Sequence, residues 1–93
     1  MNIIDAHNEP MTPELYRETF TSAWKQADHP TEVRAENETF CNLMAATAAV
    51  RVADQPYYYG ASFVLDPEMA PRELLFVVPQ RPELNCKLVN VGV

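Results

Sequence analysis

Residues 40–52, FCNLMAATAAVRV, hold ten apolar residues among thirteen, and no continuous polar face can be drawn around them as a helix. At about 100° per residue, Asn42 and Arg51 fall on opposite sides of such a helix, with Thr47 between them. A helix that is hydrophobic nearly all round is normally buried. The stretch therefore predicts a central core helix or a helix at a subunit interface.

A helical wheel divides this predicted helix into a side of large residues and a side of small ones. The large side carries Phe40, Leu43, Met44 and Val50 and is expected to pack on a sheet. Small side chains let another helix approach closely, so the second side predicts a close helix contact or a homo-oligomer seam. The candidate seam residues are Ala45, Ala46, Ala49 and Ala53.

Two helices are predicted in the first half of the chain. Thr12 is a typical N-cap, Pro13 suits the first helical position, and Glu14 lies at the positive end of the helix dipole. His29-Pro30 is expected to end this first helix, because the residue before a proline is pushed out of the α region. The second helix is predicted to begin near Pro30 and to continue through the apolar stretch to residue 54.

Beyond residue 56 the hydrophobic period changes from that of a helix to that of a strand. Strands are predicted over residues 57–65, 74–78 and 87–93, joined by short loops. The expected fold class is α+β, with two helices packed on a three-stranded antiparallel β-meander. The organisation expected is a single domain over residues 1–93: an N-terminal arm or short edge strand at 1–10, a two-helix half at 12–54 and a β half at 57–93.

The charge of the chain is uneven. Its net charge is −6, and the acidic excess lies mainly in the predicted helical half. Direct nucleic-acid binding is disfavoured, because it depends on lysine and arginine contacts to phosphate. A protein partner with a basic surface is favoured instead. The acidic residues expected to contact it are Glu14, Glu18, Glu32, Glu36 and Glu38.

The remaining composition points to a cytoplasmic protein without a cofactor. No apolar run approaches the roughly 20 residues that span a bilayer, and the N-terminus lacks the pattern of a signal peptide. Cys41 and Cys86 form no metal-binding spacing and are expected to be reduced and buried. No metal site and no membrane contact are therefore predicted.

The polar constellations predict no catalytic centre. Asp28 and His29 are adjacent, and Cys41 is a possible nucleophile, but a thiolate is disfavoured inside an apolar helix. A small enzyme that uses these three residues remains an alternative. The more suggestive feature is Tyr57-Tyr58-Tyr59, whose rings suit core packing, protein contact or stacking on a small ligand such as a nucleotide.

These observations favour a small acidic, non-enzymatic protein-binding factor. We expect an inhibitor or accessory protein, of the kind found in phages, mobile elements or antitoxin systems, that blocks a basic nucleic-acid-handling protein. Its binding residues are expected to be the five glutamates together with Tyr57, Tyr58 and Tyr59. An oligomeric nucleotide-binding or nucleotide-sequestering protein with a tyrosine-lined site is the main alternative.

Overall fold

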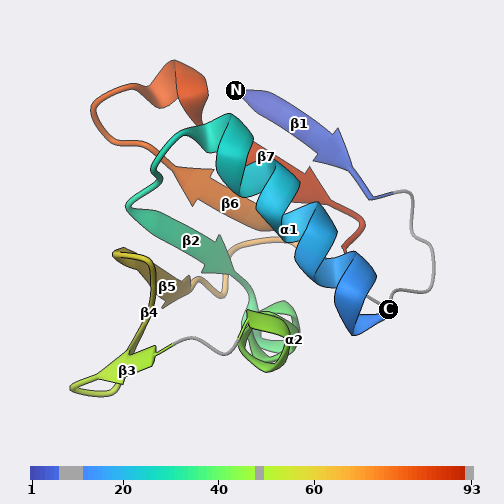
Figure 1. Ribbon diagram of the computed structural model, residues 1–93, viewed down its shortest axis with the longest axis vertical. Helices are drawn as coiled ribbons and strands as arrows, with labels where there is room; N and C mark the ends of the chain where they lie inside the picture. Colours follow the sequence, from blue (N-terminus) through green and yellow to red (C-terminus); the bar gives the residue numbers. More distant parts are fainter. Residues whose placement is uncertain (7–11, 48–49, 92–93) are drawn as a thin grey trace.

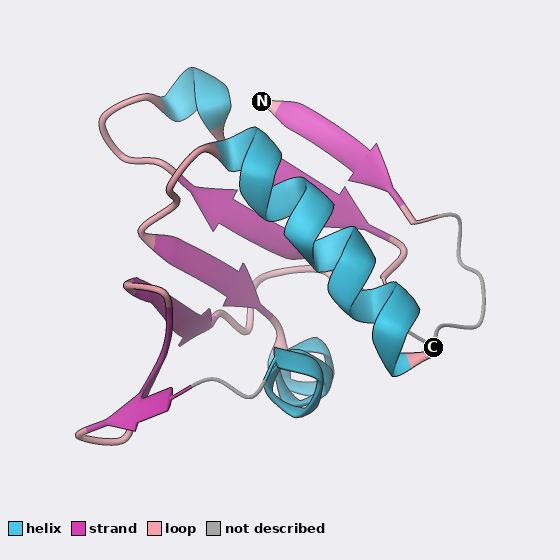
Figure 2. Ribbon diagram, viewed as in Figure 1, coloured by secondary structure: helices cyan, strands magenta, loops and turns pink. Residues whose placement is uncertain are grey.

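The computed structural model describes residues 1–6, 12–47 and 50–91 of the chain. Within them, two α-helices lie on one face of a seven-stranded sheet, and a short 3₁₀ turn precedes the last strand (Figures 1 and 2). The elements in chain order are β1 (Asn2–Asp5), α1 (Pro13–Ala27), β2 (Glu32–Ala35), α2 (Asn37–Thr47), β3 (Val50–Val52), β4 (Gln55–Tyr58), β5 (Ala61–Leu65), β6 (Leu74–Val77), η1 (Pro82–Leu84) and β7 (Cys86–Val89).

The predicted three-stranded antiparallel meander is wrong, although the class α+β with two helices is right. The described strands form one mixed sheet in the order β1-β7-β6-β2-β5-β4-β3. The pairs β1–β7 and β2–β5 are parallel, whereas β2–β6, β3–β4, β4–β5 and β6–β7 are antiparallel. β2 therefore lies at the centre of the sheet, although the predicted meander begins only after residue 56.

The predicted second helix divides into a strand, a helix and another strand. In β2, Val33 and Ala35 are buried while Glu32 and Arg34 are half-buried, which is the two-residue alternation of a strand. Glu36 then begins α2, because its Oε1 accepts hydrogen bonds from the Thr39 backbone N–H at 2.7 Å and from the Thr39 hydroxyl at 2.8 Å. Side-chain capping of this kind satisfies donors that a helix start leaves open.

The apolar stretch that suggested a central helix is shared between α2 and β3. Leu43 is fully buried, and Phe40 and Met44 pack against the core, as expected for the large side. Val50 does not join them: it lies in β3 and is 68% exposed. Since 13 apolar-rich residues fit either a helix or a helix followed by a short strand, the hydrophobic period alone could not place the boundary.

α1 is present as predicted and supplies one layer of the core. The Thr12 hydroxyl oxygen accepts a hydrogen bond from the Leu15 backbone N–H at 3.2 Å, Pro13 opens the helix, and Asp28 closes it in the left-handed region. Its buried face packs on the sheet through Tyr16, Phe20, Ala23 and Ala27. Phe20 is the centre of this contact, with its ring centroid 5.3 Å from that of Phe76 and 6.2 Å from that of Phe63.

The predicted strand 57–65 is in fact a hairpin of β4 and β5. Tyr59 and Gly60, with φ of 47° and 87°, form a two-residue turn of the type that matches the twist of a hairpin. The turn changes which side chains share a face. Tyr58 and Ala61 are paired on the helix-covered side, whereas Tyr57 is paired with Ser62 on the other.

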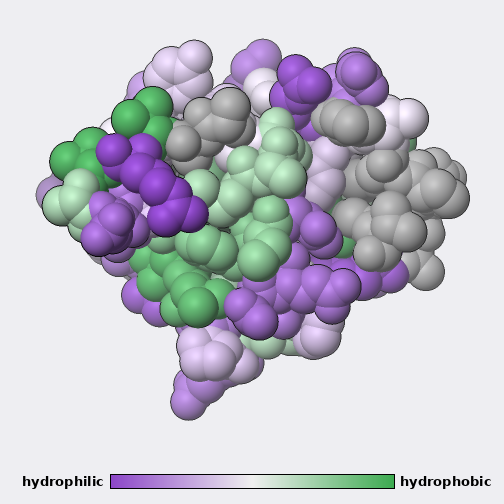
Figure 3. Space-filling view, turned by 90° about the horizontal axis from the view of Figure 1, so that it is seen from below, coloured by the Kyte–Doolittle hydropathy of each residue, from purple (hydrophilic) through white to green (hydrophobic). Residues whose placement is uncertain are grey.

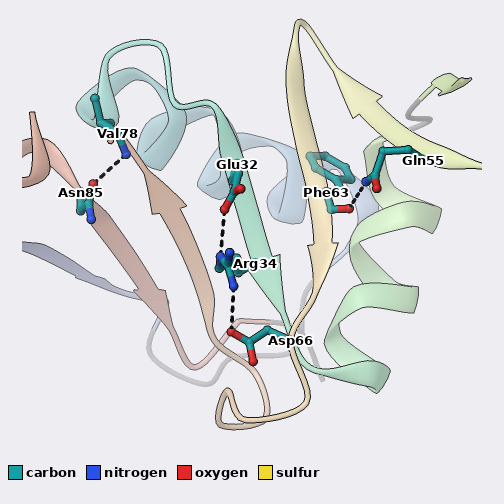
Figure 4. Close-up of polar contacts among 7 residues, drawn as sticks. All are labelled: Glu32, Arg34, Gln55, Phe63, Asp66, Val78 and Asn85. Carbon is teal, nitrogen blue, oxygen red and sulfur yellow. Dashed lines mark hydrogen bonds and ion pairs between the residues drawn. The ribbon is translucent and has the colours of Figure 1, made fainter. Parts of the chain in front are cut away.

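Pro56 interrupts the ladder between β4 and β5 and is compensated by the residue before it. The register places Pro56 opposite Phe63, where a backbone N–H would normally donate to the Phe63 carbonyl. The Gln55 side chain replaces it: Nε2 donates to the Phe63 carbonyl oxygen at 2.7 Å (Figure 4). An amide side chain thus fills the gap that the proline leaves.

β6 lies where a strand is predicted over residues 74–78. β7 ends at Val89, before Asn90 with its φ of 57°, and residues 92–93 of the predicted strand 87–93 lie outside the described residues. Leu74 and Phe76 are fully buried beneath the helices, whereas Leu75 and Val77 face the other side and are half-buried.

Both described helices are too short or too polar to cross a bilayer.

Candidate functional site

Three turns meet at one end of the molecule, which we call the loop end: residues 28–31, 59–60 and 78–85. They meet because β2 and β5 are parallel and begin together, while β6 ends beside them (Figure 1). Two backbone hydrogen bonds join the turns, from the Ser62 N–H to the Thr31 carbonyl and from the Thr31 N–H to the Val77 carbonyl, both at 2.9 Å. Segments far apart in sequence therefore form one continuous surface.

Tyr59 is the most exposed large hydrophobic residue of the described chain, at 87%. It occupies the first position of its turn at positive φ, where asparagine, aspartate or glycine is normally found and a tyrosine is strained. Its ring meets that of Tyr58 edge-on at 4.7 Å, and Tyr58 in turn contacts Trp24 at 5.2 Å. These three residues form an aromatic ledge whose outermost member is Tyr59.

Tyr58 anchors the ledge to the core. Its ring packs edge-on against Phe20 at 5.3 Å and lies parallel to that of Phe63 at 6.0 Å. Burial, and to a smaller extent the neighbouring Tyr59, raises the pKa of Tyr58. Tyr58 is thus a packing residue, and Tyr59 is the one that is free to contact another molecule.

Asp28 and His29 lie at the same loop end and share an unusual backbone geometry. Both have positive φ, 52° and 61°, and their side chains are 60% and 94% exposed, with His29 Nε2 3.7 Å from Asp28 Oδ1. Backbone strain of this kind concentrates at functional sites, although it does not identify the function. The structure does not bring Cys41 to this pair, because α2 begins at the opposite end of β2 (Figure 1).

The five glutamates expected at a protein contact do not form one patch. Glu14 and Glu18 are exposed on α1, where Arg17 and Lys25 balance them, and Glu38 is exposed on α2. Hydrogen bonds from Thr39 hold the pKa of Glu36 below its ordinary value and commit that carboxylate to the start of α2. An open, shallow depression on the outer side of α1 is lined by Arg17, Glu18, Thr21, Ser22 and Lys25.

The fifth, Glu32, lies on the open face, by which we mean the face of the sheet away from both described helices. There Arg34 donates from Nε to Glu32 at 2.9 Å and from Nη1 to Asp66 at 3.3 Å (Figure 4). These carboxylates raise the pKa of the Arg34 guanidinium, most strongly through the hydrogen bond to Glu32. Tyr57 is on this face as well, so the three consecutive tyrosines lie in three different environments.

The candidate seam residues do not form a helical stripe either. Ala45 is exposed and Ala46 is half-buried against the core, but Ala53 lies in the β3–β4 turn with φ of 50°, and Ala49 is outside the described residues. Seen from below, hydrophobic side chains do gather over α2 and the neighbouring β3–β4 hairpin (Figure 3). This apolar surface combines a helix and a hairpin, which a helical wheel could not predict.

The sequence predicts Tyr59 as a contact residue but does not predict the turn that exposes it. The dipeptide Tyr59-Gly60 between two β-rich segments is a hairpin signal that could have separated it from Tyr57 and Tyr58. Arg34 falls within the predicted second helix, but the structure places it in β2. Within the described residues, no group of three or more histidine, cysteine or acidic side chains is placed to hold a metal ion.

Comparison of the chain with models of protein families, with curated proteins and with solved structures finds no match.

Proposed function

We propose that this chain is a non-enzymatic protein-binding factor whose anchor is Tyr59 at the loop end. The observation that carries the proposal is a large aromatic side chain, 87% exposed, held at positive φ in a turn that asparagine would form with less strain. The core does not need this ring, since Tyr58 and Trp24 fill the space beneath it. Rigid, exposed tyrosines are typical anchors of protein interfaces.

The partner that we propose has a basic surface, and the chain acts on it as an inhibitor or accessory protein. The net charge of −6 supports this chemistry, together with the exposed carboxylates of Glu14, Glu18 and Glu38. Because these groups are dispersed, their expected effect is on the rate of association, by long-range steering. Tyr59 is expected to determine the lifetime of the complex instead.

The test is affinity capture from the native host with three immobilised proteins: the wild type, Tyr59→Asn and Ala53→Asn. Ala53 is a matched control, because it also holds the first position of a two-residue hairpin turn at positive φ, at the tip of the β3–β4 hairpin. A partner captured by the wild type and by Ala53→Asn but lost with Tyr59→Asn supports the proposal. Equal capture by all three proteins contradicts the role of Tyr59.

The electrostatic part has a separate test on the captured partner. Replacing Glu14, Glu18 and Glu38 by glutamine should slow association at low salt and leave dissociation nearly unchanged, because exposed charges act mainly on encounter. An unchanged association rate, with unchanged salt dependence, would remove the basic-partner claim while leaving the Tyr59 anchor intact.

A further inference from the structure

The open face carries apolar side chains at several positions where a sheet surface in contact with water is usually polar. An antiparallel or mixed sheet covered on one side normally alternates apolar residues inward with polar residues outward. Here the outward positions of the strands include Val64, Leu75, Val77 and Val89, all half-buried, and Tyr57 beside them. These apolar side chains lie on both sides of Glu32 and Arg34, the outward residues of the central strand β2, so the face combines apolar flanks with a charged centre.

The middle of this face is nearly neutral, in a chain that is otherwise acidic. Its basic groups, Arg34 and Lys87, are already paired with carboxylates of the same chain: Arg34 with Glu32 and Asp66, and Lys87 with Glu73 at 3.4 Å. Among the described residues there, three carboxylates against two basic groups leave one excess negative charge, out of a net −6 for the chain. A strongly basic partner would gain little from this surface, whereas a second copy could approach it without strong repulsion.

The register of the strands makes the face complementary to itself. One row across it contains Ser62, Glu32 and Val77, and the next row contains Val64, Arg34 and Leu75. Two copies can pack with their open faces together, related by a two-fold axis that lies between the sheets and runs perpendicular to the strands. The first row of one copy then lies over the second row of the other copy. Each Glu32 then faces an Arg34, and each Val77 faces a Leu75.

From this complementarity we infer that the open face is a homodimer interface between two copies of the chain, packed sheet to sheet with their β2 strands antiparallel. Self-complementary contact is what a two-fold interface requires. The seven strands, about 4.8 Å apart and three to five residues long, give a plane of roughly 500 Å². That is below the approximately 800 Å² per partner of a typical stable interface, so the dimer is reversible and concentration-dependent.

This interface is separate from the loop end, and the two proposals can fail independently. Antiparallel packing of the β2 strands directs the two copies of Tyr59 toward opposite ends of the dimer. Each copy therefore keeps its aromatic ledge available to a partner.

Sedimentation velocity with charge-reversed variants tests the inference. Arg34→Glu and Glu32→Arg should each weaken the dimer at least about 10-fold, because like charges then face each other across the axis. An equimolar mixture of the two variants should recover a dimer, since each acidic face then meets a basic one. Arg17→Glu and Glu18→Arg, which make the same charge changes on the outer side of α1, should associate as the wild type does.

Thermal unfolding followed by circular dichroism checks that each variant is folded. If either reversal at β2 unfolds the chain, Val77→Lys replaces it: Val77 is half-buried, and its substitution should leave a folded monomer. A wild type that is monomeric at concentrations up to about 1 mM overturns the inference. So does a mixture of Arg34→Glu and Glu32→Arg that associates no better than either variant alone, or a Val77→Lys variant that dimerises normally.

Discussion

Replacing Gln55 by alanine should destabilise the sheet out of proportion to the half-buried position of this side chain. Nε2 supplies the hydrogen bond that the Phe63 carbonyl cannot receive from Pro56, and Phe63 is itself 1% exposed. Leaving such an acceptor unsatisfied costs about 1 to 3 kcal/mol, and partial access of water favours the lower half of that range. We expect a loss of about 1.5 kcal/mol in the free energy of unfolding, which lowers Tm by roughly 6 to 12 °C.

A double-mutant cycle with Pro56→Val tests the mechanism behind that number. Valine restores a backbone N–H opposite the Phe63 carbonyl, so Gln55→Ala in this background should cost less than about 0.5 kcal/mol. The assay is urea unfolding monitored by circular dichroism, with all four proteins at one concentration. The reasoning is refuted if Gln55→Ala costs the same with and without Pro56→Val, or if the single change leaves stability as it is.

Three further predictions follow from single groups in the structure. The Tyr16 hydroxyl is buried without a hydrogen-bond partner, so Tyr16→Phe should raise the free energy of unfolding by about 1 kcal/mol; a loss of stability would show that the hydroxyl is bonded. The folded-state pKa of Glu36 lies below its ordinary 4.5, so the stability that its carboxylate contributes is present above pH 4.5 and is lost as the pH falls through the lower folded value. In Glu36→Gln, the urea midpoint of unfolding should therefore fall less between neutral and acidic pH than it does in the wild type. An unchanged dependence of the midpoint on pH would contradict this. Burial raises the pKa of the Cys86 thiol, whereas Cys41 is exposed. Iodoacetamide should therefore alkylate Cys41 alone in the folded protein, which mass spectrometry can measure. Equal labelling of both cysteines would place Cys86 nearer the surface.

The parts of the fold that the sequence predicted are those with strong local signals. α1 combines Thr12, Pro13 and a clear apolar period, and all three act within a few residues of one another. The short strands β2 and β3 have no such signal. Val33 and Ala35 fit a helix as well as a strand, and residues 40–52 are too uniformly apolar to mark where the helix ends. β1 pairs in parallel with β7 from the other end of the chain, a contact that only the tertiary fold decides.

The candidate site was predictable in composition and not in arrangement. Tyr59 and the exposed glutamates were identified by residue type. The turn at Tyr59-Gly60, which takes Tyr59 out of the strand and leaves Tyr57 on the same face as Ser62, was not predicted. The pairing of Arg34 with both Glu32 and Asp66 depends on β2 lying beside β5. Such neighbours become visible only once the strand order is known.

We infer that Tyr59 serves binding at the expense of local stability, and a single substitution measures both properties. Tyr59→Asn should relieve about 1 kcal/mol of turn strain and lose about 0.5 kcal/mol of ring contact with Tyr58, so Tm should rise by roughly 2 to 4 °C. The affinity for the captured partner should meanwhile fall at least about 30-fold, as for an interface anchor worth 2 kcal/mol. A variant that binds as tightly as the wild type, or one that unfolds at a lower temperature, would contradict the account.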